Sequence, residues 1–512
     1  MLVKTYSSAV QGIEAYSITI EVNITTGTKY FIVGLPDNAV KESLRRIETA
    51  IINIEHRMPR QKIVVNLAPA DIRKEGSSYD LGIAVGILAA SAQIPCAKTA
   101  DYLILGELSL DGSILPVRGV LPITMQAKTD GFKGIILPTQ NAREAAIVSD
   151  MEVYGVDHIK QVVQFFTEEQ ALTPTIVDLE AEFQQHFDKY DIDFADVKGQ
   201  ENIKRALEIA AAGGHNVILI GPPGAGKTML AKRLPTILPP LTLEESLETT
   251  KIHSVSGYLS AAESLMHRRP FRSPHHTISD VALVGGGTHP QPGEISLAHN
   301  GVLFLDELPE FKRTVLEVMR QPLESRHIHI SRAKFSVEYP ASFMLIASMN
   351  PCPCGFHNHP EISCVCGPTL VQRYLSKISG PLLDRIDLHV EVTPVAFTEL
   401  SSSRTSERSE AIRTRVIQAR LMQETRFQQS QHVHCNAHMS SKSLREVCQI
   451  EETGKTLLLN AMQRLNLSAR AYDRILKVAR TIADLDGSER IKNEHLAEAI
   501  QFRSLDRENW SG

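Results

Sequence analysis

The stretch Gly221–Thr228, with the sequence GPPGAGKT, decides the fold of this chain. The apolar run Val217–Ile220 before it predicts a short buried strand, and Lys227–Leu238 behind it predicts a helix. A glycine-rich turn in this context indicates a phosphate-binding loop, because backbone N–H groups can close around phosphate oxygens where no Cβ intervenes. A simple glycine–proline turn between a strand and a helix is the alternative.

The residue types of this loop suit a nucleoside triphosphate. The start of the helix adds partial positive charge. Lys227 can reach the β- and γ-phosphates, and the Thr228 hydroxyl can bind Mg²⁺. We therefore expect ATP and Mg²⁺ as cofactors, bound by Gly221, Pro222, Pro223, Gly224, Ala225, Gly226, Lys227 and Thr228.

The composition is that of an ordinary globular protein. The chain has 512 residues, of which 43% are hydrophobic and 22% charged, and this length predicts about three domains. The net charge is −5 and the isoelectric point about 6.5, so any basic surface for nucleic acid must be local.

No apolar run reaches the roughly 18 residues of a membrane span, and the first residues lack the apolar core of a signal peptide. We therefore expect a cytoplasmic protein with no membrane partner. The 7 cysteines do not form a disulfide framework in so long a chain.

The N-terminal region predicts an α+β domain. Apolar and polar residues alternate over Ile18–Ile24, Thr25–Thr28 predicts a turn, and Tyr30–Val33 predicts the return strand of a hairpin. A helix is expected from Pro36 to Ile51, and another strand at Ile63–Leu67.

Two stretches of this region, Lys74–Leu81 and Gly106–Gly119, resemble the proteolytic domain of Lon, which has a ribosomal-protein-S5-like fold. Lon's nucleophilic serine corresponds to Ser78, but its lysine corresponds to Leu121. Leucine cannot act as the base that a serine nucleophile needs, so we expect the fold without the peptidase activity. A different base nearby is the remaining route to hydrolysis, either Lys74 or Asp80.

Two further apolar runs end in polar residues that suit ATP hydrolysis. Val302–Leu305 is followed by Asp306, which can bind Mg²⁺, and by Glu307, which can orient and polarise the attacking water. Phe343–Met349 is followed by Asn350, which can contact the γ-phosphate or the water. The alternative for Asn350 is a residue that simply ends a strand before a turn.

The segment Asp193–Gln200 resembles the one that lies over adenine in AAA+ proteins, and Gly380–Asp387 (GPLLDRID) resembles their arginine-finger motif. In that motif Arg385 would stabilise charge on a phosphoryl group held by the neighbouring subunit of a ring. The alternative is a surface arginine paired with Asp384 or Asp387.

The C-terminal region shows the apolar spacing of helices. Its segment Leu467–Arg474 resembles the second sensor of AAA+ proteins, in which Arg470 would reach the nucleotide. Arg474 is the competing choice, and an exposed charge on a helix is the other alternative.

Two basic segments are candidates for contacts with DNA. Arg326–Tyr339 predicts a β-hairpin with Arg332 and Lys334 at its tip, where they would contact phosphates without sequence preference. A second loop carries Arg268, Arg269, Arg272, His275 and His276. The alternative for each charged segment is a solvated turn or loop.

Four cysteines gather in one short segment as two C-x-C pairs: Cys352, Cys354, Cys364 and Cys366. Four thiolates can hold tetrahedral Zn²⁺, although structural sites usually space the pairs as C-x₂₋₄-C. His357 and His359 are alternative ligands, and a reduced loop without metal is the other possibility.

Asn350–Gly355 (NPCPCG), Arg373–Arg385 (RYLSKISGPLLDR) and the order of the motifs resemble the magnesium-chelatase-like AAA+ family called YifB or ComM, over essentially the whole chain. The resemblance implies a hexameric ATPase that moves DNA, as a helicase promoting branch migration in recombination and natural transformation. The alternatives are a chelatase-type motor that remodels a metal-insertion partner, a protease-related factor, and a scaffold switched by nucleotide without turnover.

The expected fold class is an α/β P-loop AAA+ core, a parallel sheet with helices on both faces, between an α+β Lon-protease-like domain and an all-α lid. The expected boundaries are 1–165 for the N-terminal domain, 166–190 for a linker, 191–395 for the ATPase core, 396–410 for a polar linker and 411–512 for the helical C-terminal domain.

Overall fold

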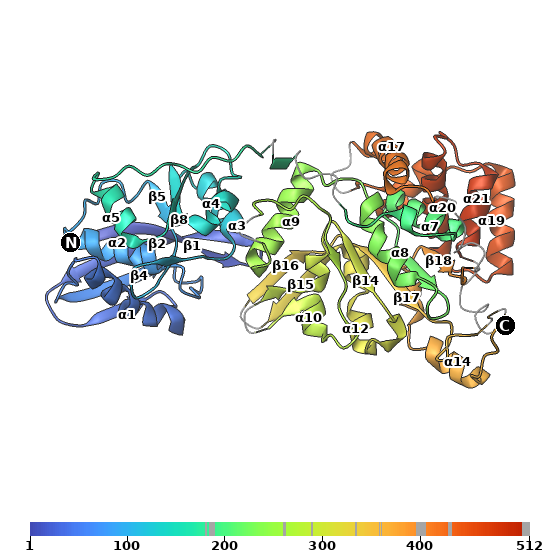
Figure 1. The fold of residues 1–512 in the computed structure, drawn as a ribbon, viewed down its shortest axis with the longest axis horizontal. Coiled ribbons are helices and arrows are strands. Elements are labelled where there is room, and N and C mark those ends of the chain that lie inside the picture. Colours follow the sequence, from blue (N-terminus) through green and yellow to red (C-terminus); the bar gives the residue numbers. More distant parts are fainter. Residues whose placement is uncertain are drawn as a thin grey trace. The chain divides into compact units, whose positions relative to one another are not determined.

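The computed structural model describes residues 1–179, 182–183, 190–259, 263–287, 290–332, 335–357, 359, 361–395, 406–428 and 433–503. The chain divides into two compact units, Met1–Phe187 with Thr242–His267, and Asp188–Leu241 with Arg268–Gly512 (Figure 1). The sequence analysis left residues 242–267 inside the ATPase core, whereas in the structure this segment packs with the first unit.

A seven-stranded mixed sheet forms the centre of the first unit. Its strand order is β3 (Tyr30–Val33), β4 (Lys62–Ala68), β2 (Glu14–Thr25), β1 (Leu2–Gln11), β5 (Tyr102–Ile104), β8 (Gly134–Pro138) and β9 (Glu152–Val156). A two-stranded ribbon is made by β6 (Glu107–Leu108) and β7 (Ile114–Leu115).

The predicted hairpin between β2 and β3 is wrong, because β4 lies between them. β4 pairs antiparallel with β2 and parallel with β3. Burial explains the order: Ile63, Val65 and Leu67 of β4 are fully buried, whereas the side chains of β3 suit an edge, with Tyr30 37% and Phe31 43% exposed.

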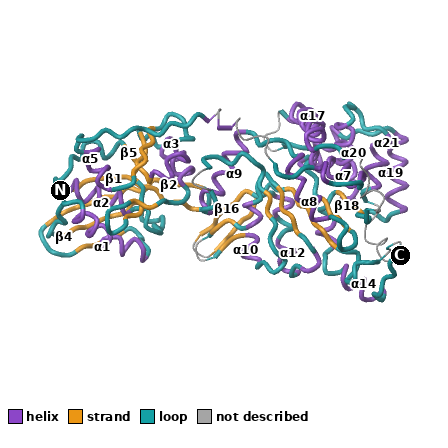
Figure 2. Tube along the Cα trace, in the orientation of Figure 1, coloured by secondary structure: helices purple, strands orange, loops and turns teal. Residues whose placement is uncertain are grey.

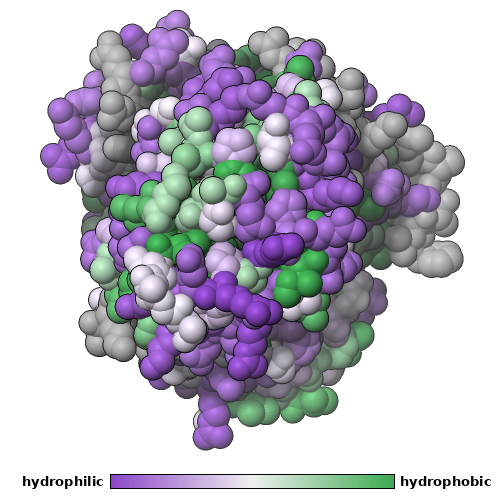
Figure 3. All heavy atoms as spheres, turned by 90° about the vertical axis from the view of Figure 1, so that its left-hand side faces the viewer, coloured by the Kyte–Doolittle hydropathy of each residue, from purple (hydrophilic) through white to green (hydrophobic). Residues whose placement is uncertain are grey.

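Figure 3 views the chain from the left-hand side of Figure 1, and hydrophobic residues there lie among hydrophilic ones.

The helix predicted from Pro36 to Ile51 is present in the first unit as α1 (Asn38–Asn53). This helix begins after Asp37, whose carboxylate accepts a hydrogen bond from the Val40 N–H at 2.8 Å. α2 (Asp80–Ala90) is buried along its whole length. The other helices are α3 (Val120–Thr129), α4 (Thr139–Ala145), α5 (Ile159–Phe166) and α9 (Leu243–Ser256).

The second unit is built on a five-stranded parallel sheet, seen as orange strands between purple helices in Figure 2. The strand order is β11 (Phe271–Arg272), β14 (Val302–Leu305), β17 (Met344–Met349), β10 (Val217–Ile220) and β18 (Leu388–Glu391). The three central strands are buried at every position, as expected for a parallel sheet between helices.

Short helices and ribbons complete the core of the second unit. The helical segments are η1 (Phe194–Asp196), α7 (Glu201–Gly213), α8 (Lys227–Arg233), η2 (Leu234–Ile237), α10 (Asp280–Val284), α11 (Glu294–Leu297), η3 (Leu308–Glu310), α12 (Arg313–Val318), α13 (Pro322–Ser325), α14 (Pro368–Leu375) and α15 (Gly380–Leu383). The ribbons are β12 (Gly285–Gly286) with β13 (Gln291–Pro292), and β15 (His327–Arg332) with β16 (Phe335–Pro340).

A helical C-terminal region packs on α7 and shares its hydrophobic core with the sheet. Its helices are α17 (Ser409–Phe427), η4 (Asn436–His438), α18 (Ser441–Val447), α19 (Glu452–Arg464), α20 (Ala469–Leu485) and α21 (Asn493–Gln501). The described helices contain no stretch with the length and apolar character needed to cross a membrane.

Candidate active site

The strand order of the second unit brings the three sequence motifs to one edge of the sheet. β10, β14 and β17 run parallel, so their carboxyl ends meet at the same edge. The phosphate-binding loop follows β10, Asp306 and Glu307 follow β14, and Asn350 follows β17. Ligands of open parallel sheets bind outside these strand ends.

The glycines of the loop occupy backbone positions that other residues rarely adopt. Gly224 and Gly226 have φ angles of +77° and +84°. A Cβ on Gly221 would lie 2.2 Å from the carbonyl oxygen of Val392, which follows β18. The loop therefore needs glycine both for its turns and for its close approach to the neighbouring strand.

Lys227 is directed back across the mouth of the loop and is only 8% exposed. Its Nζ donates hydrogen bonds to the carbonyl oxygens of Gly221 at 2.6 Å and Pro222 at 2.9 Å, and to Asn350 Oδ1 at 3.0 Å. The ammonium thus joins the loop to the end of β17, where an anionic ligand could replace some of these contacts.

Burial lowers the pKa of Lys227 to about 8, against the opposing charges of Asp306 and Glu307. Bound phosphate would raise this pKa, so above about pH 8 nucleotide binding must take up a proton. We expect the dissociation constant for ATP to rise with pH above 8, by at most about tenfold per pH unit. Titrations from about pH 7 to 9.5, with calorimetry in two buffers of different ionisation enthalpy, would measure both effects. A constant affinity across this range would contradict the assignment of Lys227.

Asp306 is held by two hydroxyl groups. Thr228 Oγ1 donates to Asp306 Oδ2 at 2.8 Å, and the Ser348 hydroxyl donates to the other carboxylate oxygen, Oδ1. Oxygen donors from Thr228 and Asp306 are the ligand types that Mg²⁺ prefers. These two residues therefore fit the metal site predicted for them.

Glu307 lies beside this site in an unusual backbone conformation. Its φ is +54°, in the left-handed region, which costs about 1 kcal/mol or more for a residue other than glycine. Its backbone N–H donates to Asp306 Oδ1 at 3.1 Å, and its exposed carboxylate lies 3.6 Å from His276 Nδ1. The turn directs the carboxylate into solvent at the end of β14, where a water nucleophile would be reached.

Three residues that the sequence analysis did not assign to this site contribute to it. Ser348 orients Asp306, and His276 lies beside Glu307. Gln200 joins the loop to the segment after β18 by donating to the carbonyl oxygens of Ala225 at 2.8 Å and Thr393 at 3.3 Å. Gln200 lies in the segment Asp193–Gln200 and Ser348 in the run before Asn350, but the sequence does not show which groups these side chains contact, so their roles come from the fold.

Arg385 lies away from the phosphate-binding loop of its own chain. It is 5% exposed, its Nη2 pairs with Glu324 at 2.5 Å, and its Nη1 donates to the Pro381 carbonyl at 2.5 Å. The partner is therefore neither Asp384 nor Asp387, the two carboxylates that the sequence suggested. A pocket of about 340 Å³ lies over it, lined by Glu317, Arg320, Gln321, Glu324, Ser325 and Arg385.

The two arginines proposed as the second sensor differ in their surroundings. Arg474 pairs with buried Asp387 at 2.7 Å. Burial opposes ionisation of Asp387, but the charge of Arg474, the neighbouring His215 ring and a hydrogen bond from the Asn216 N–H hold the pKa of this carboxyl well below its usual range. Arg470 is exposed in the first turn of α20. The assignment to Arg470 stays a prediction, with Arg474 engaged inside the unit.

The hairpin predicted as a DNA contact forms from β15 and β16, paired antiparallel. Lys334 and the side chain of Arg332 lie outside the described residues, so the predicted tip stays a prediction.

The second basic loop is built into the fold. Arg269 donates to the carbonyl oxygens of Pro239, Pro240 and Asn300. Arg272 forms two hydrogen bonds with Glu294, at 2.6 and 2.7 Å. These arginines therefore hold neighbouring segments of the unit together, which argues against a loop of solvated charges.

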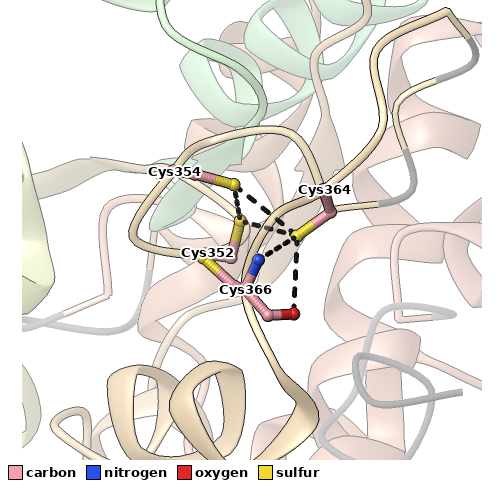
Figure 4. Close-up of side chains that lie close together, drawn as sticks. All are labelled: Cys352, Cys354, Cys364 and Cys366. Atoms are coloured by element: carbon pink, nitrogen blue, oxygen red, sulfur yellow. Dashed lines mark hydrogen bonds between the residues drawn. The ribbon is translucent and has the colours of Figure 1, made fainter.

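The sulfur atoms of the four cysteines lie close together (Figure 4). Cys352 Sγ lies 3.3 Å from Cys354 Sγ and 3.7 Å from Cys364 Sγ, and all four sulfurs lie within 4.8 Å of one another. Sulfurs bound tetrahedrally at about 2.3 Å from zinc are about 3.8 Å apart. The donor set therefore fits a zinc ion despite the short C-x-C spacing.

The histidines offered as alternative ligands are not part of this cluster in the described residues. His359 Nδ1 accepts backbone hydrogen bonds from Glu361 at 3.1 Å and Ile362 at 3.0 Å. It shapes the loop between the two C-x-C pairs.

In the first unit, the place of Lon's lysine holds a buried hydrophobic residue. Leu121 is fully buried, and its N–H donates to Glu144, which also accepts a hydrogen bond from Ser254 of α9. A leucine at this position cannot act as the base, and the loss of peptidase activity stays a prediction.

The two alternative bases near Ser78 have other partners. Lys74 is buried and donates to the carbonyl oxygens of Pro69 and Ile72. Asp80 forms two hydrogen bonds with Arg46, at 2.7 and 3.1 Å. Neither group is thereby oriented as the base of a serine nucleophile.

Comparison with known proteins covers nearly the whole chain. Family models for magnesium chelatase, subunit ChlI, match residues 193–400 and 20–141, and a model for the ChlI C-terminal region matches 406–503. Competence protein ComM of Haemophilus influenzae is 44% identical over 509 residues, covering 98% of this chain and 97% of that protein.

Two other relatives bear on the assignment. The uncharacterized protein YifB of Escherichia coli is 44% identical over 507 residues, covering 98% of this chain and 97% of its own. Lon protease 2 of Bacillus subtilis is 31% identical over 159 residues, 28% of this chain and 27% of that protein. The second match supports the Lon-like fold of the first unit.

A phosphate-binding loop, a carboxylate pair and an asparagine at neighbouring ends of a five-stranded parallel sheet define a P-loop ATPase of the AAA+ class. Within that class, the chain belongs to the YifB/ComM family of magnesium-chelatase ChlI-like ATPases. The resemblance read from the sequence motifs is thereby confirmed.

Proposed function

We propose that this chain is the subunit of an ATP-hydrolysing ring motor that acts on DNA, as a helicase or in branch migration. The observation that carries the ATPase part is the contact of Lys227 with Asn350 and of Thr228 with Asp306 at one edge of the sheet. The DNA part is supported by the relation to a competence protein over 98% of the chain.

The proposed roles follow from position and chemistry. Lys227 and the loop backbone bind the β- and γ-phosphates, and Thr228 and Asp306 hold Mg²⁺, which neutralises charge on the phosphates. Glu307 orients and polarises the attacking water, and Asn350 positions the γ-phosphate or that water. Arg470 is proposed to reach the nucleotide from α20, as a sensor of its state.

The motor is proposed to be a homo-oligomeric ring, with a hexamer as the expected size. Arg385 contacts Glu324 and Pro381 and not the phosphate-binding loop of its own chain. Its side chain lines an open pocket. In a ring, such an arginine completes the ATP site of the neighbouring subunit. The two parts of each site then come from two subunits. The same assembly provides a central pore for nucleic acid.

The proposed cofactors are ATP and Mg²⁺, with Zn²⁺ at Cys352, Cys354, Cys364 and Cys366 in a structural role. The sulfur geometry supports the zinc site. Reduced thiols without metal are the alternative that a measurement of zinc content distinguishes.

The proposed function is tested by the ATPase rate of the full chain with and without forked and duplex DNA. Stimulation by either DNA supports a DNA motor. An ATPase that binds neither single- nor double-stranded DNA at low salt would contradict it. A chelatase-type motor, suggested by the description of the matching family model, would instead respond to a protein partner.

Charge reversal at the hairpin tests its proposed contact with DNA. The double change Arg332→Glu and Lys334→Glu is expected to lower DNA affinity at least tenfold at low salt and to remove DNA stimulation of the ATPase, because phosphate contacts are electrostatic. Fluorescence anisotropy with labelled forked DNA measures the affinity. The double change Lys442→Glu and Arg445→Glu, at exposed positions of α18, is the matched control. Equal losses in the control and the hairpin variant would contradict a specific role for the hairpin.

A further inference from the structure

The loop that carries the four cysteines lies directly against the phosphate-binding loop. Gly355, between Cys354 and the rest of the loop, has a φ of +87°. A Cβ at this glycine would lie 2.4 Å from Cδ and 3.1 Å from Cγ of the Pro223 ring. The backbone of the cysteine loop therefore packs on the proline of the phosphate-binding loop, at a distance that only glycine permits.

The same loop begins at Asn350, the residue that contacts Lys227 of the phosphate-binding loop. Asn350 Oδ1 accepts the 3.0 Å hydrogen bond from Lys227 Nζ, and Cys352, two residues later, is fully buried. At its other end Cys366 is followed by Gly367, the residue before α14. The four sulfurs thus close a loop that starts in the active site and touches it again at Pro223.

Hydrophobic packing contributes little to the structure of this loop. Among the described residues of 351–367, Cys352 is the only hydrophobic residue that is buried. Thiol-to-thiol hydrogen bonds are weak, so they do not replace a hydrophobic core. A metal ion bound by four thiolates supplies folding free energy directly to such a loop.

We propose that Zn²⁺ held by the four thiolates fixes the cysteine loop against Pro223, and that metal loading thereby sets the affinity of the phosphate-binding loop for ATP. The inference rests on the proposed nucleotide site, and it extends a structural zinc ion to control of substrate binding. Without the metal, the Gly355 contact and the position of Asn350 lose their support. The loop must then order itself when nucleotide binds, at a cost in affinity.

The first test uses the full chain as purified under reducing conditions. We expect about one zinc per chain, measured by mass spectrometry of the metal. Removal of zinc with a chelator is expected to raise the dissociation constant of a non-hydrolysable ATP analogue at least about tenfold, and added zinc to restore it. A protein that holds no zinc, or that binds the analogue equally with and without zinc, contradicts the inference. A zinc-loaded protein that binds no nucleotide contradicts the proposed ATPase instead.

Variants separate the zinc site from its contact with the loop. Cys366→Ser is expected to lose zinc and the same affinity, whereas Cys96→Ser, at an exposed free cysteine of the first unit, should keep both. Gly355→Ala is expected to retain zinc but to bind the analogue more weakly, since its methyl group displaces Pro223. Circular dichroism checks that each variant folds. Should Cys366→Ser fail to fold, Gly355→Ala with zinc content and affinity both unchanged still contradicts the inference.

Discussion

Glu307→Gln is expected to abolish ATP turnover while ATP stays bound. We expect the hydrolysis rate to fall by about 10²–10⁴-fold, the typical contribution of a positioned general base. The dissociation constant for ATP should change by less than about threefold, because the loop and Lys227 provide the phosphate contacts. Single-turnover hydrolysis and binding of radiolabelled ATP measure the two quantities separately.

The physical reason lies in what the substitution removes. Glutamine keeps the length and shape of Glu307 but cannot accept a proton from the attacking water. The backbone contacts of residue 307 with Asp306 and Ser348 involve its N–H and are retained. The metal ligands Thr228 and Asp306 also keep their hydrogen bond. The substitution should therefore lower the rate of hydrolysis and leave the affinity for ATP nearly unchanged.

Glu310→Gln is the matched control. Glu310 is a nearby carboxylate at the end of η3, paired at 3.4 Å with exposed Lys377, and its neutralisation should leave the rate within about twofold because surface pairs contribute little. If Glu307→Gln hydrolyses ATP at the rate of the unaltered protein, the catalytic assignment is wrong. If the unaltered protein and Glu307→Gln both bind ATP but neither hydrolyses it, the protein is the nucleotide-switched scaffold.

The centre of the site could be predicted from the sequence because each motif follows a buried strand. The runs Val217–Ile220, Val302–Leu305 and Met344–Met349 are wholly buried, and short runs that are apolar throughout, or apolar except for Ser348 in the third, are typical of buried parallel strands. Parallel strands place their carboxyl ends together, so the residues behind them meet. This local signal was sufficient for the phosphate-binding loop, Asp306 and the position of Asn350.

Pairing between distant segments could not be predicted in the same way. The hairpin prediction used the short turn after β2, whereas β4 (Lys62–Ala68), far along the chain, competes for the same strand edge and forms a longer ladder. Ser348 reaches Asp306 only because β17 is the neighbour of β14. Likewise, the fold brings Arg385 into contact with Glu324, although Asp384 and Asp387 are closer in sequence.

Arg385→Ala is expected to lower ATP hydrolysis by about 10³-fold or more, within the range found for arginine fingers. Nucleotide affinity should change little, since Arg385 contacts Glu324 and Pro381 and not the phosphate-binding loop of its own chain. Glu324 is 52% exposed and can be solvated after the change, whereas Arg385 itself is 5% exposed, so circular dichroism is needed to check that the variant folds. Arg445→Ala, at an exposed position of α18, provides the control for loss of a surface charge.

Mixing two inactive variants decides whether Arg385 acts on a neighbour. Lys227→Ala lacks a working phosphate-binding loop but retains Arg385, and Arg385→Ala has the reverse defect. If the two parts of a site come from adjacent subunits, a ring assembled from equal amounts contains both at about a quarter of its interfaces. The mixture should then recover up to about a quarter of the original rate, provided that the subunits exchange and each interface works independently. If both parts come from one chain, no mixture can restore activity, so an inactive mixture of co-assembled subunits would contradict the action of Arg385 on a neighbouring subunit.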